Sequence, residues 1–79
     1  MGESRIRRIE AGSPLTEREL QCLQLAALGN TNAKIGQMLY LSQDTVKGHM
    51  GRAFRRLEAK DRANAVYLAV AQGYIKAVA

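Results

Sequence analysis

The feature of this sequence that most limits its fold is a series of four helix start signals, each followed by apolar residues at helical spacing. The first is Thr16, which forms a capping box with Glu19: each side chain can accept a hydrogen bond from the backbone amide of the other residue. The other three signals are the segment Asn30-Thr31-Asn32, Ser42 and Asp61. Each cap contributes only about 1 kcal/mol, but the agreement of all four caps with the apolar period predicts four helices.

The predicted helices cover about 17–28, 32–40, 43–58 and 62–72, and no segment has the alternation expected of a strand. Gly29 and Gly73 follow two of them and suit the left-handed conformation that commonly ends a helix. The residues expected to face inward are Ile35, Met38 and Leu39 in the second helix and Val46, Met50, Ala53, Phe54 and Leu57 in the third. The sequence therefore predicts an all-α fold.

The length of 79 residues allows a single domain. Residues 1–14 show little apolar periodicity and end in a Gly-Ser-Pro breaker, so we interpret them as a flexible tail or the remnant of a linker, followed by the domain at 15–76. The apolar stretches fall far short of the roughly 20 residues that cross a bilayer, and no apolar segment follows the basic residues near the N-terminus. We therefore expect a cytoplasmic domain without membrane contact.

Catalytic and metal-binding functions have little support in this composition. One cysteine, Cys22, and one histidine, His49, can form neither an internal disulfide nor a zinc site on their own. No nucleophile with an adjacent base and no phosphate-binding loop is visible, so we predict that the chain is not an enzyme and has no catalytic residue, cofactor or metal. Cys22 is expected in the core, and Glu19 is expected to cap its helix and to pair with Arg56 or Arg62.

Two short helices separated by a tight turn, the second of them basic on its outer face, are typical of a helix-turn-helix. Residues 42–60 carry five basic and two acidic residues, whereas residues 15–30 carry one basic and two acidic residues. One outward stripe of the third helix consists of Asp44, Lys47, Gly48, Gly51 and Arg55. Each glycine inside a helix costs about 0.5–1 kcal/mol, but a missing side chain lets another surface, such as the wall of a DNA major groove, come close.

The same residues also resemble a known family. The matching features are Leu15-Thr16 with Arg18-Glu19, Gly29 with Asn32, Ile35 with Leu39, Ser42 followed by Thr45-Val46-Lys47 and His49, and then Leu57, Arg62 and Ala65-Val66. At these spacings, over roughly residues 14–75, the set resembles the LuxR-type helix-turn-helix domain, also described as GerE- or NarL-like. The resemblance implies a bacterial transcription regulator that binds DNA as a dimer. The chain departs from the family pattern at Ala33-Lys34, at Gly36, where the family commonly has alanine, and at Glu58-Ala59.

Position in the helices and the resemblance together select the residues expected to contact DNA. Lys47 lies early on the outward stripe, where the family has a contact lysine. Thr45 stands at a helix N-terminus, which favours phosphate, and the start of the second helix is expected to lie against the DNA backbone. The full set of expected contacts is Thr31, Asn32, Lys34, Ser42, Asp44, Thr45, Lys47, Gly48, His49, Gly51, Arg52 and Arg55. A packed position is an equal alternative for His49, as is a purely local cap for Asn32, and Arg56 is expected to be structural.

The fourth helix has almost no polar face, and the other three helices of so small a domain can cover only one side of it. A second copy of the chain, related by two-fold symmetry, would cover the other side, and the resemblance also makes this helix the dimer contact. The expected interface residues are Ala63, Tyr67, Leu68, Val70 and Ala71. The alternative is that a further domain or the N-terminal tail covers this face.

These observations favour a transcription regulator that binds specific double-stranded DNA with residues 43–57 in the major groove. The alternative is a protein-interaction module, in which the same basic helix contacts an acidic partner such as an RNA polymerase subunit. Steep salt dependence with preference for one duplex over a scrambled one supports the regulator. Binding to an acidic protein without any duplex preference supports the interaction module.

Overall fold

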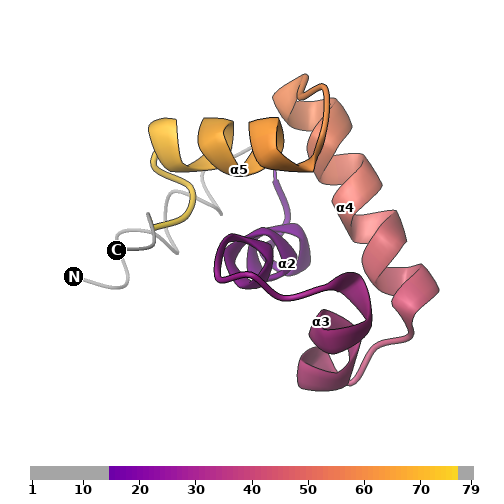
Figure 1. The fold of residues 1–79 in the computed structure, drawn as a ribbon. Helices are drawn as coiled ribbons and strands as arrows, with labels where there is room; N and C mark the ends of the chain where they lie inside the picture. Colours follow the sequence, from indigo (N-terminus) through magenta and orange to yellow (C-terminus); the bar gives the residue numbers. More distant parts are fainter. Residues whose placement is uncertain (1–14, 77–79) are drawn as a thin grey trace.

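The computed structural model describes residues 15–76, so the predicted tail at 1–14 lies outside the described residues. Four helices follow one another in this range: α2 (Glu17–Ala27), α3 (Asn32–Leu39), α4 (Gln43–Leu57) and α5 (Arg62–Ala71). No strand occurs between residues 15 and 76. The predicted all-α class is therefore confirmed (Figure 1).

Each helix begins at the residue that the sequence predicts, and each ends one residue before its predicted end. The four N-cap side chains each accept a hydrogen bond from the amide three residues later, and these caps are Thr16, Thr31, Ser42 and Asp61. The residues predicted to end the helices are instead the C-caps Leu28, Tyr40, Glu58 and Gln72. Tyr40 and Glu58 take left-handed conformations with φ of 60° and 56°, which ends α3 and α4 without a glycine.

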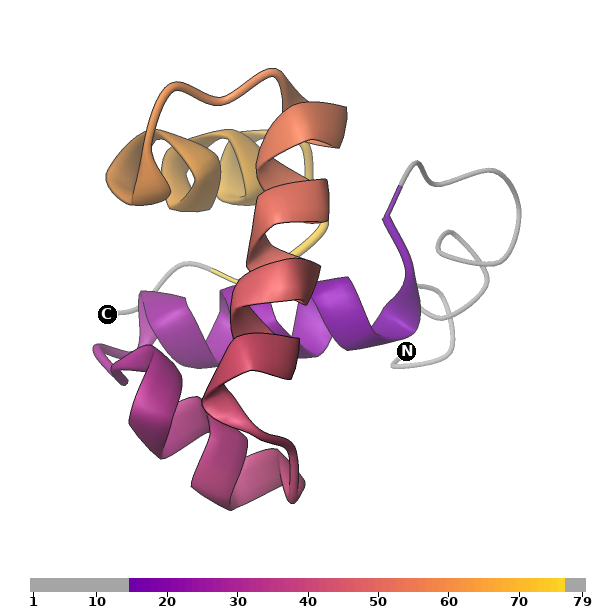
Figure 2. The ribbon, with the colours of Figure 1, turned by 90° about the vertical axis from the view of Figure 1, so that its right-hand side faces the viewer.

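α2 and α4 form the centre of the fold, and each of them contacts the other three helices. α4 lies across α2, the start of α4 lies beside α3, and the chain returns from the end of α4 into α5 (Figure 2). The α3–turn–α4 unit is therefore supported from behind by α2, while the opposite side of α4 is turned away from the rest of the domain.

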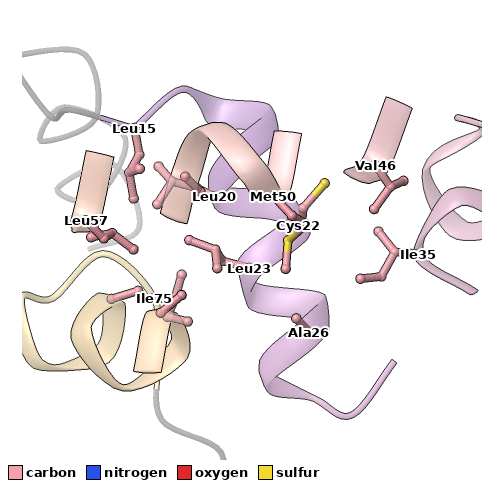
Figure 3. Packing of buried hydrophobic residues seen from close by; sticks show 13 residues of the cluster. Leu15, Leu20, Cys22, Leu23, Ala26, Ile35, Val46, Met50, Leu57 and Ile75 are labelled. Atoms are coloured by element: carbon pink, nitrogen blue, oxygen red, sulfur yellow. The ribbon is translucent and has the colours of Figure 1, made fainter. Parts of the chain in front are cut away.

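A single apolar cluster fills the space between the helices (Figure 3). Its buried members are Leu15, Leu20, Cys22, Leu23, Ala26, Ile35, Val46, Met50, Ala53, Leu57, Ala65, Ala69 and Ile75. The inward positions predicted for α4 are confirmed, with Phe54 packed at the edge of the cluster. The prediction for Met38 is wrong, since its side chain is 44% exposed. The buried side of α3 runs through Ile35 and Gly36, with Leu39 partly buried, and Met38 falls beyond the edge of that narrow stripe.

Glu19 is the only charged side chain in the core of residues 15–76, and it is 1% exposed. Its Oε1 accepts from the Thr16 amide at 3.0 Å, which completes the predicted capping box with the Thr16 side chain. Arg56 Nη1 on α4 donates to both carboxylate oxygens, at 2.7 and 2.8 Å, and Arg52 Nε lies 3.5 Å from Oε2. The predicted pairing with Arg56 is confirmed. Arg62, the other predicted partner, instead donates to the start of α3.

The turn between α3 and α4 requires the glycine at position 36. The Leu41 amide donates to the Gly36 carbonyl at 2.8 Å, which folds the turn back onto α3. A Cβ at position 36 would lie only 2.5 Å from the Leu41 carbonyl oxygen. The departure from the family pattern at this position is therefore matched to the close approach of the turn in this chain.

We expect Gly36→Ala to destabilise the domain, although alanine favours a helix over glycine by about 0.5–1 kcal/mol. The new Cβ would force the Leu41 backbone to move, and overpacking of this kind typically costs about 1–3 kcal/mol. Urea unfolding should therefore give a lower midpoint than that of the wild type. The matched control is Gly48→Ala, whose Cβ would meet only the Arg52 side chain at 3.6 Å and should raise the midpoint. An equal gain in both variants would contradict the steric role of Gly36.

Candidate nucleic-acid interface

The outward stripe of α4 is assembled as the sequence predicts. Asp44, Lys47 and Arg55 are exposed, and Gly48 and Gly51 lie between them, partly covered. The opposite side of the helix is buried through Val46, Met50, Ala53 and Leu57. The stripe therefore lies on the side of α4 that is turned away from the core.

Neither glycine of the stripe is required by its neighbours in the described chain. A Cβ at Gly48 would lie 3.6 Å from Arg52 Nη1, and one at Gly51 would lie 3.7 Å from Arg55 Nη1, which are ordinary contacts. Both arginines thus fold back along the helix over a glycine four positions earlier. Because the helix would gain stability from alanine at both positions, the glycines are better explained by a surface that must approach the α4 backbone from outside.

The start of α4 is organised by two hydroxyl groups. Ser42 Oγ accepts from the Thr45 amide at 3.0 Å and donates to Thr45 Oγ1 at 2.9 Å. Both hydrogen bonds of the Ser42 hydroxyl are therefore made within the cap. The Thr45 hydroxyl accepts a hydrogen bond from Ser42, and its own O–H group can still donate to a further acceptor. Both side chains are exposed beside the first turn of α4, where N–H groups and the helix dipole favour an anion.

The start of α3 lies next to the stripe. An open hollow of about 240 Å³ is lined by Asn32, Arg62 and the α4 residues Lys47, Met50, Gly51 and Phe54. Thr31 is the N-cap and accepts from the Lys34 amide at 3.2 Å, and the Lys34 side chain is exposed. The purely local cap considered for Asn32 is wrong, because Asn32 Oδ1 accepts from Arg62 Nη1 at 2.7 Å, across 30 positions of sequence.

His49 and Arg52 lie on the flank of α4 that turns toward α2, beside the stripe rather than on it. Arg52 Nη2 is 3.0 Å from His49 Nδ1, and Arg52 Nε is 3.5 Å from the Glu19 carboxylate. Both side chains therefore take part in a network that leads from the stripe to the core. Arg56 is structural, as predicted, since its guanidinium is bound by Glu19.

Sequence reasoning did not find the role of Arg62. Its guanidinium, in the first turn of α5, donates to Asn32 Oδ1 and to the Asn30 carbonyl oxygen. No local spacing relates residues 30 positions apart, and the only sequence signal is the presence of arginine at the first position of a helix, where a basic residue is unfavourable for the helix dipole.

The described residues contain neither a metal-ligand cluster nor a membrane-spanning helix. No group of three or more His, Cys, Asp or Glu side chains lies close enough to hold a metal ion in residues 15–76. Cys22 is fully buried; burial raises the pKa of its thiol, a nearby Glu19 raises it further and Arg18 opposes the shift, so the group is an inert core residue. Between the same limits, every helix is too short or too polar to traverse the hydrocarbon of a membrane.

Comparison with known proteins agrees with this geometry. The family model described as "Bacterial regulatory proteins, luxR family" matches residues 13–69. The uncharacterized transcriptional regulatory protein YxjL of Bacillus subtilis is 39% identical over 67 residues, which are 85% of this chain and 31% of that protein. The transcriptional regulatory protein DegU of Brevibacillus brevis is 39% identical over 62 residues, 78% of this chain and 26% of that protein.

A solved structure, that of the transcription factor GerE, is similar throughout the helical region. It has a TM-score of 0.78 and 26% sequence identity, and the match covers 82% of this chain and 97% of that one. The similarity therefore extends over nearly all of the GerE chain, whereas this chain spans only about a third or less of the curated relatives YxjL and DegU.

The contact between Arg52 and His49 predicts the tautomer of the histidine. A guanidinium can only donate, so Nδ1 accepts and Nε2 carries the ring proton. We expect ¹⁵N NMR to show the Nε2–H tautomer at a pH where the ring is neutral, and Arg52→Met to redistribute the two tautomers. Arg55→Met, which leaves this contact in place, is the control. A proton found on Nδ1 in the wild type would show that the contact does not persist in solution.

Proposed function

Because the chain belongs to the LuxR family of bacterial regulatory proteins, we propose that it binds specific double-stranded DNA, as a transcription regulator or as the DNA-binding domain of one. The observation that carries the proposal is the exposed stripe of α4, in which two glycines unnecessary for packing lie between Lys47 and Arg55. A helix whose backbone is partly exposed at two glycines, with basic side chains on both sides of them, fits the floor and walls of a major groove.

In this proposal α4 enters the major groove and α3 lies across the DNA backbone. The stripe residues Asp44, Lys47, Gly48, Gly51 and Arg55 face the base edges, and the remaining proposed contacts, Thr31, Asn32, Lys34, Ser42, Thr45, His49 and Arg52, flank them. Ser42 contributes to DNA binding indirectly, because it orients the Thr45 hydroxyl. Arg52 contributes by orienting His49 and by its positive charge. The domain acts by binding alone, in the cytoplasm, without a catalytic step.

The experiment that tests the function is selection from a pool of randomised duplexes with the purified chain, followed by titration of the selected and a scrambled duplex at several salt concentrations. We expect a preferred sequence and a steep fall of affinity with salt. Binding to RNA polymerase without preference among duplexes would favour the protein-interaction alternative instead.

Lys47→Ala should weaken duplex binding while the fold is retained, because Lys47 is exposed on the stripe and lines the hollow beside α3. If Lys47 reads guanine, the loss should be about 1–3 kcal/mol and should concentrate on the preferred sequence. If it contacts phosphate, both duplexes should weaken alike and the slope of log affinity against log salt should flatten by about one.

Lys60→Ala is the matched control for Lys47→Ala. It removes the same charge from an exposed position after the end of α4, away from the stripe. We expect only a small loss of affinity, equal for both duplexes, from the weaker long-range attraction. Equal losses in the two variants would show that Lys47 contributes charge but no contact.

We propose further that α5 pairs two copies of the chain. Ala65 and Ala69 are fully buried against the domain, whereas Ala63, Tyr67 and Ala71 form an exposed stripe on α5 and Tyr67 is 66% exposed. Leu68 and Val70 are partly buried and border this stripe. A two-fold pair through α5 would present two α4 helices to half-sites about 34–36 Å apart.

Tyr67→Glu should separate pairing from folding, because Tyr67 lies on the exposed side of α5 and its replacement removes no core contact. We expect the variant to stay helical by circular dichroism and to lose most affinity for a two-site duplex, with little change for a single half-site. Gln37→Glu, an exposed position on α3, controls for the added charge. Light scattering that shows a monomeric wild type at high concentration would contradict the proposed dimer.

A further inference from the structure

Arg62 joins the start of α5 to the start of α3, and both of its contacts are made at the predicted DNA-facing end of α3. Arg62 Nη1 donates to Asn32 Oδ1 at 2.7 Å, and Nη2 donates to the Asn30 carbonyl oxygen. We propose that Arg62 is a positioning residue for DNA binding: it orients the Asn32 side-chain amide so that its NH₂ group is presented to a backbone phosphate. This inference rests on the proposed function.

The orientation of the Asn32 amide follows from the chemistry of its partner. An arginine side chain has five N–H donors and no acceptor. The atom of Asn32 that faces the guanidinium must therefore be the carbonyl oxygen, and the NH₂ group must point away from Arg62. Without Arg62 the two ends of the amide could exchange by rotation about χ2. With Arg62 in place, Asn32 offers donors, and no acceptor, on its other side.

The surroundings of Asn32 suit an anion. Asn32 and Arg62 line the same open hollow as Lys47 and Gly51, two residues of the outward stripe of α4. Asn32 is also the first residue of α3, so the N–H groups and positive dipole end of an eight-residue helix add to the Lys47 ammonium. A phosphate beside the stripe would thus meet an amide donor, a lysine and a helix start at once.

Arg62 itself contributes through Asn32 rather than by direct contact. Two of its guanidinium N–H donors are already directed at carbonyl oxygens of the α2–α3 loop and α3, and the residue is only partly exposed. The two hydrogen bonds, from Nη1 to Asn32 and from Nη2 to Asn30, depend on the planar guanidinium group of arginine, and a lysine ammonium at the same position cannot reproduce this geometry. Arg62→Lys therefore removes the positioning and keeps the charge.

Two sets of variants test this role, each with titration of the duplex selected for the wild type and with thermal unfolding. Arg62→Lys should weaken binding about 3- to 10-fold with an unchanged salt slope, as expected for loss of a hydrogen bond to a charged group without loss of a positive charge. Asn32→Ala should weaken binding to a similar degree. The double variant should be no weaker than Asn32→Ala alone, because both changes remove one contact.

Asn32→Asp provides a test that does not depend on the stability of an Arg62 variant. The carboxylate still accepts from Arg62, now with opposite charges, so the unfolding temperature should not fall. Its second oxygen, however, replaces the NH₂ group and faces the phosphate, so binding should fall by about 10-fold or more. Gln37→Glu adds the same charge five residues further along α3, about 140° around the helix, and should cost less than about 3-fold.

Arg18→Lys is the matched control for Arg62→Lys, because Arg18 is an exposed arginine on α2 whose guanidinium contacts Gln21 of the same helix. It should bind as the wild type does. Three results would overturn the positioning role while the wild type still binds its duplex. The first is wild-type affinity in Arg62→Lys, and the second is a double variant whose fold-loss of affinity is the product of the two single losses. The third is an equal loss of affinity in Asn32→Asp and Gln37→Glu. A wild type that prefers no duplex would overturn the proposed function, and this inference with it.

Discussion

The placement of α4 depends on the buried carboxylate of Glu19. A carboxylate that is 1% exposed is tolerated only if its oxygens are hydrogen-bonded and its charge is balanced. The Thr16 amide supplies a donor from the start of α2, and Arg56 Nη1, near the end of α4, supplies a positive charge and donates to both carboxylate oxygens. One side chain therefore caps one helix and holds a second against it. The carboxylate therefore holds α4 against α2 at the level of Arg56 and Arg52, which lie one turn apart on the same face of α4.

This arrangement divides the basic residues of α4 between two sides of the helix. Arg56 and, more loosely, Arg52 are drawn toward Glu19, while Lys47 and Arg55 remain on the outward stripe. The positive charge counted along the sequence is thus larger than the charge that faces outward. The remaining outward charge is concentrated beside two glycines, which leave the α4 backbone partly exposed. The stripe is therefore defined as much by missing side chains as by charged ones.

The local features of the fold were predictable from the sequence, and the contacts between distant segments were not. The four N-caps and the α4 core positions follow from spacing along one helix, and all of them are confirmed. The left-handed C-cap at Tyr40 was missed because no glycine marks it, and Met38 was misplaced because eight residues of α3 show only two turns of the period. For the interface, the stripe could be predicted, but the contact of Arg62 with Asn32 could not, since it depends on how α5 packs.

The packing of α5 relates the surface proposed for pairing to the surface proposed for DNA. Ala65 and Ala69 are small enough to bring the helix close to α2 and α4, which leaves Tyr67 on the outer side. At its start, Arg62 holds α3; just beyond its end, the Gln24 side chain of α2 bonds to both the amide and the carbonyl of Lys76. The start of α5 is thus tied to the start of α3, and the segment that follows α5 is tied to α2. The helix that carries the surface proposed for pairing is therefore joined, through Arg62, to the end of α3 that is proposed to face DNA.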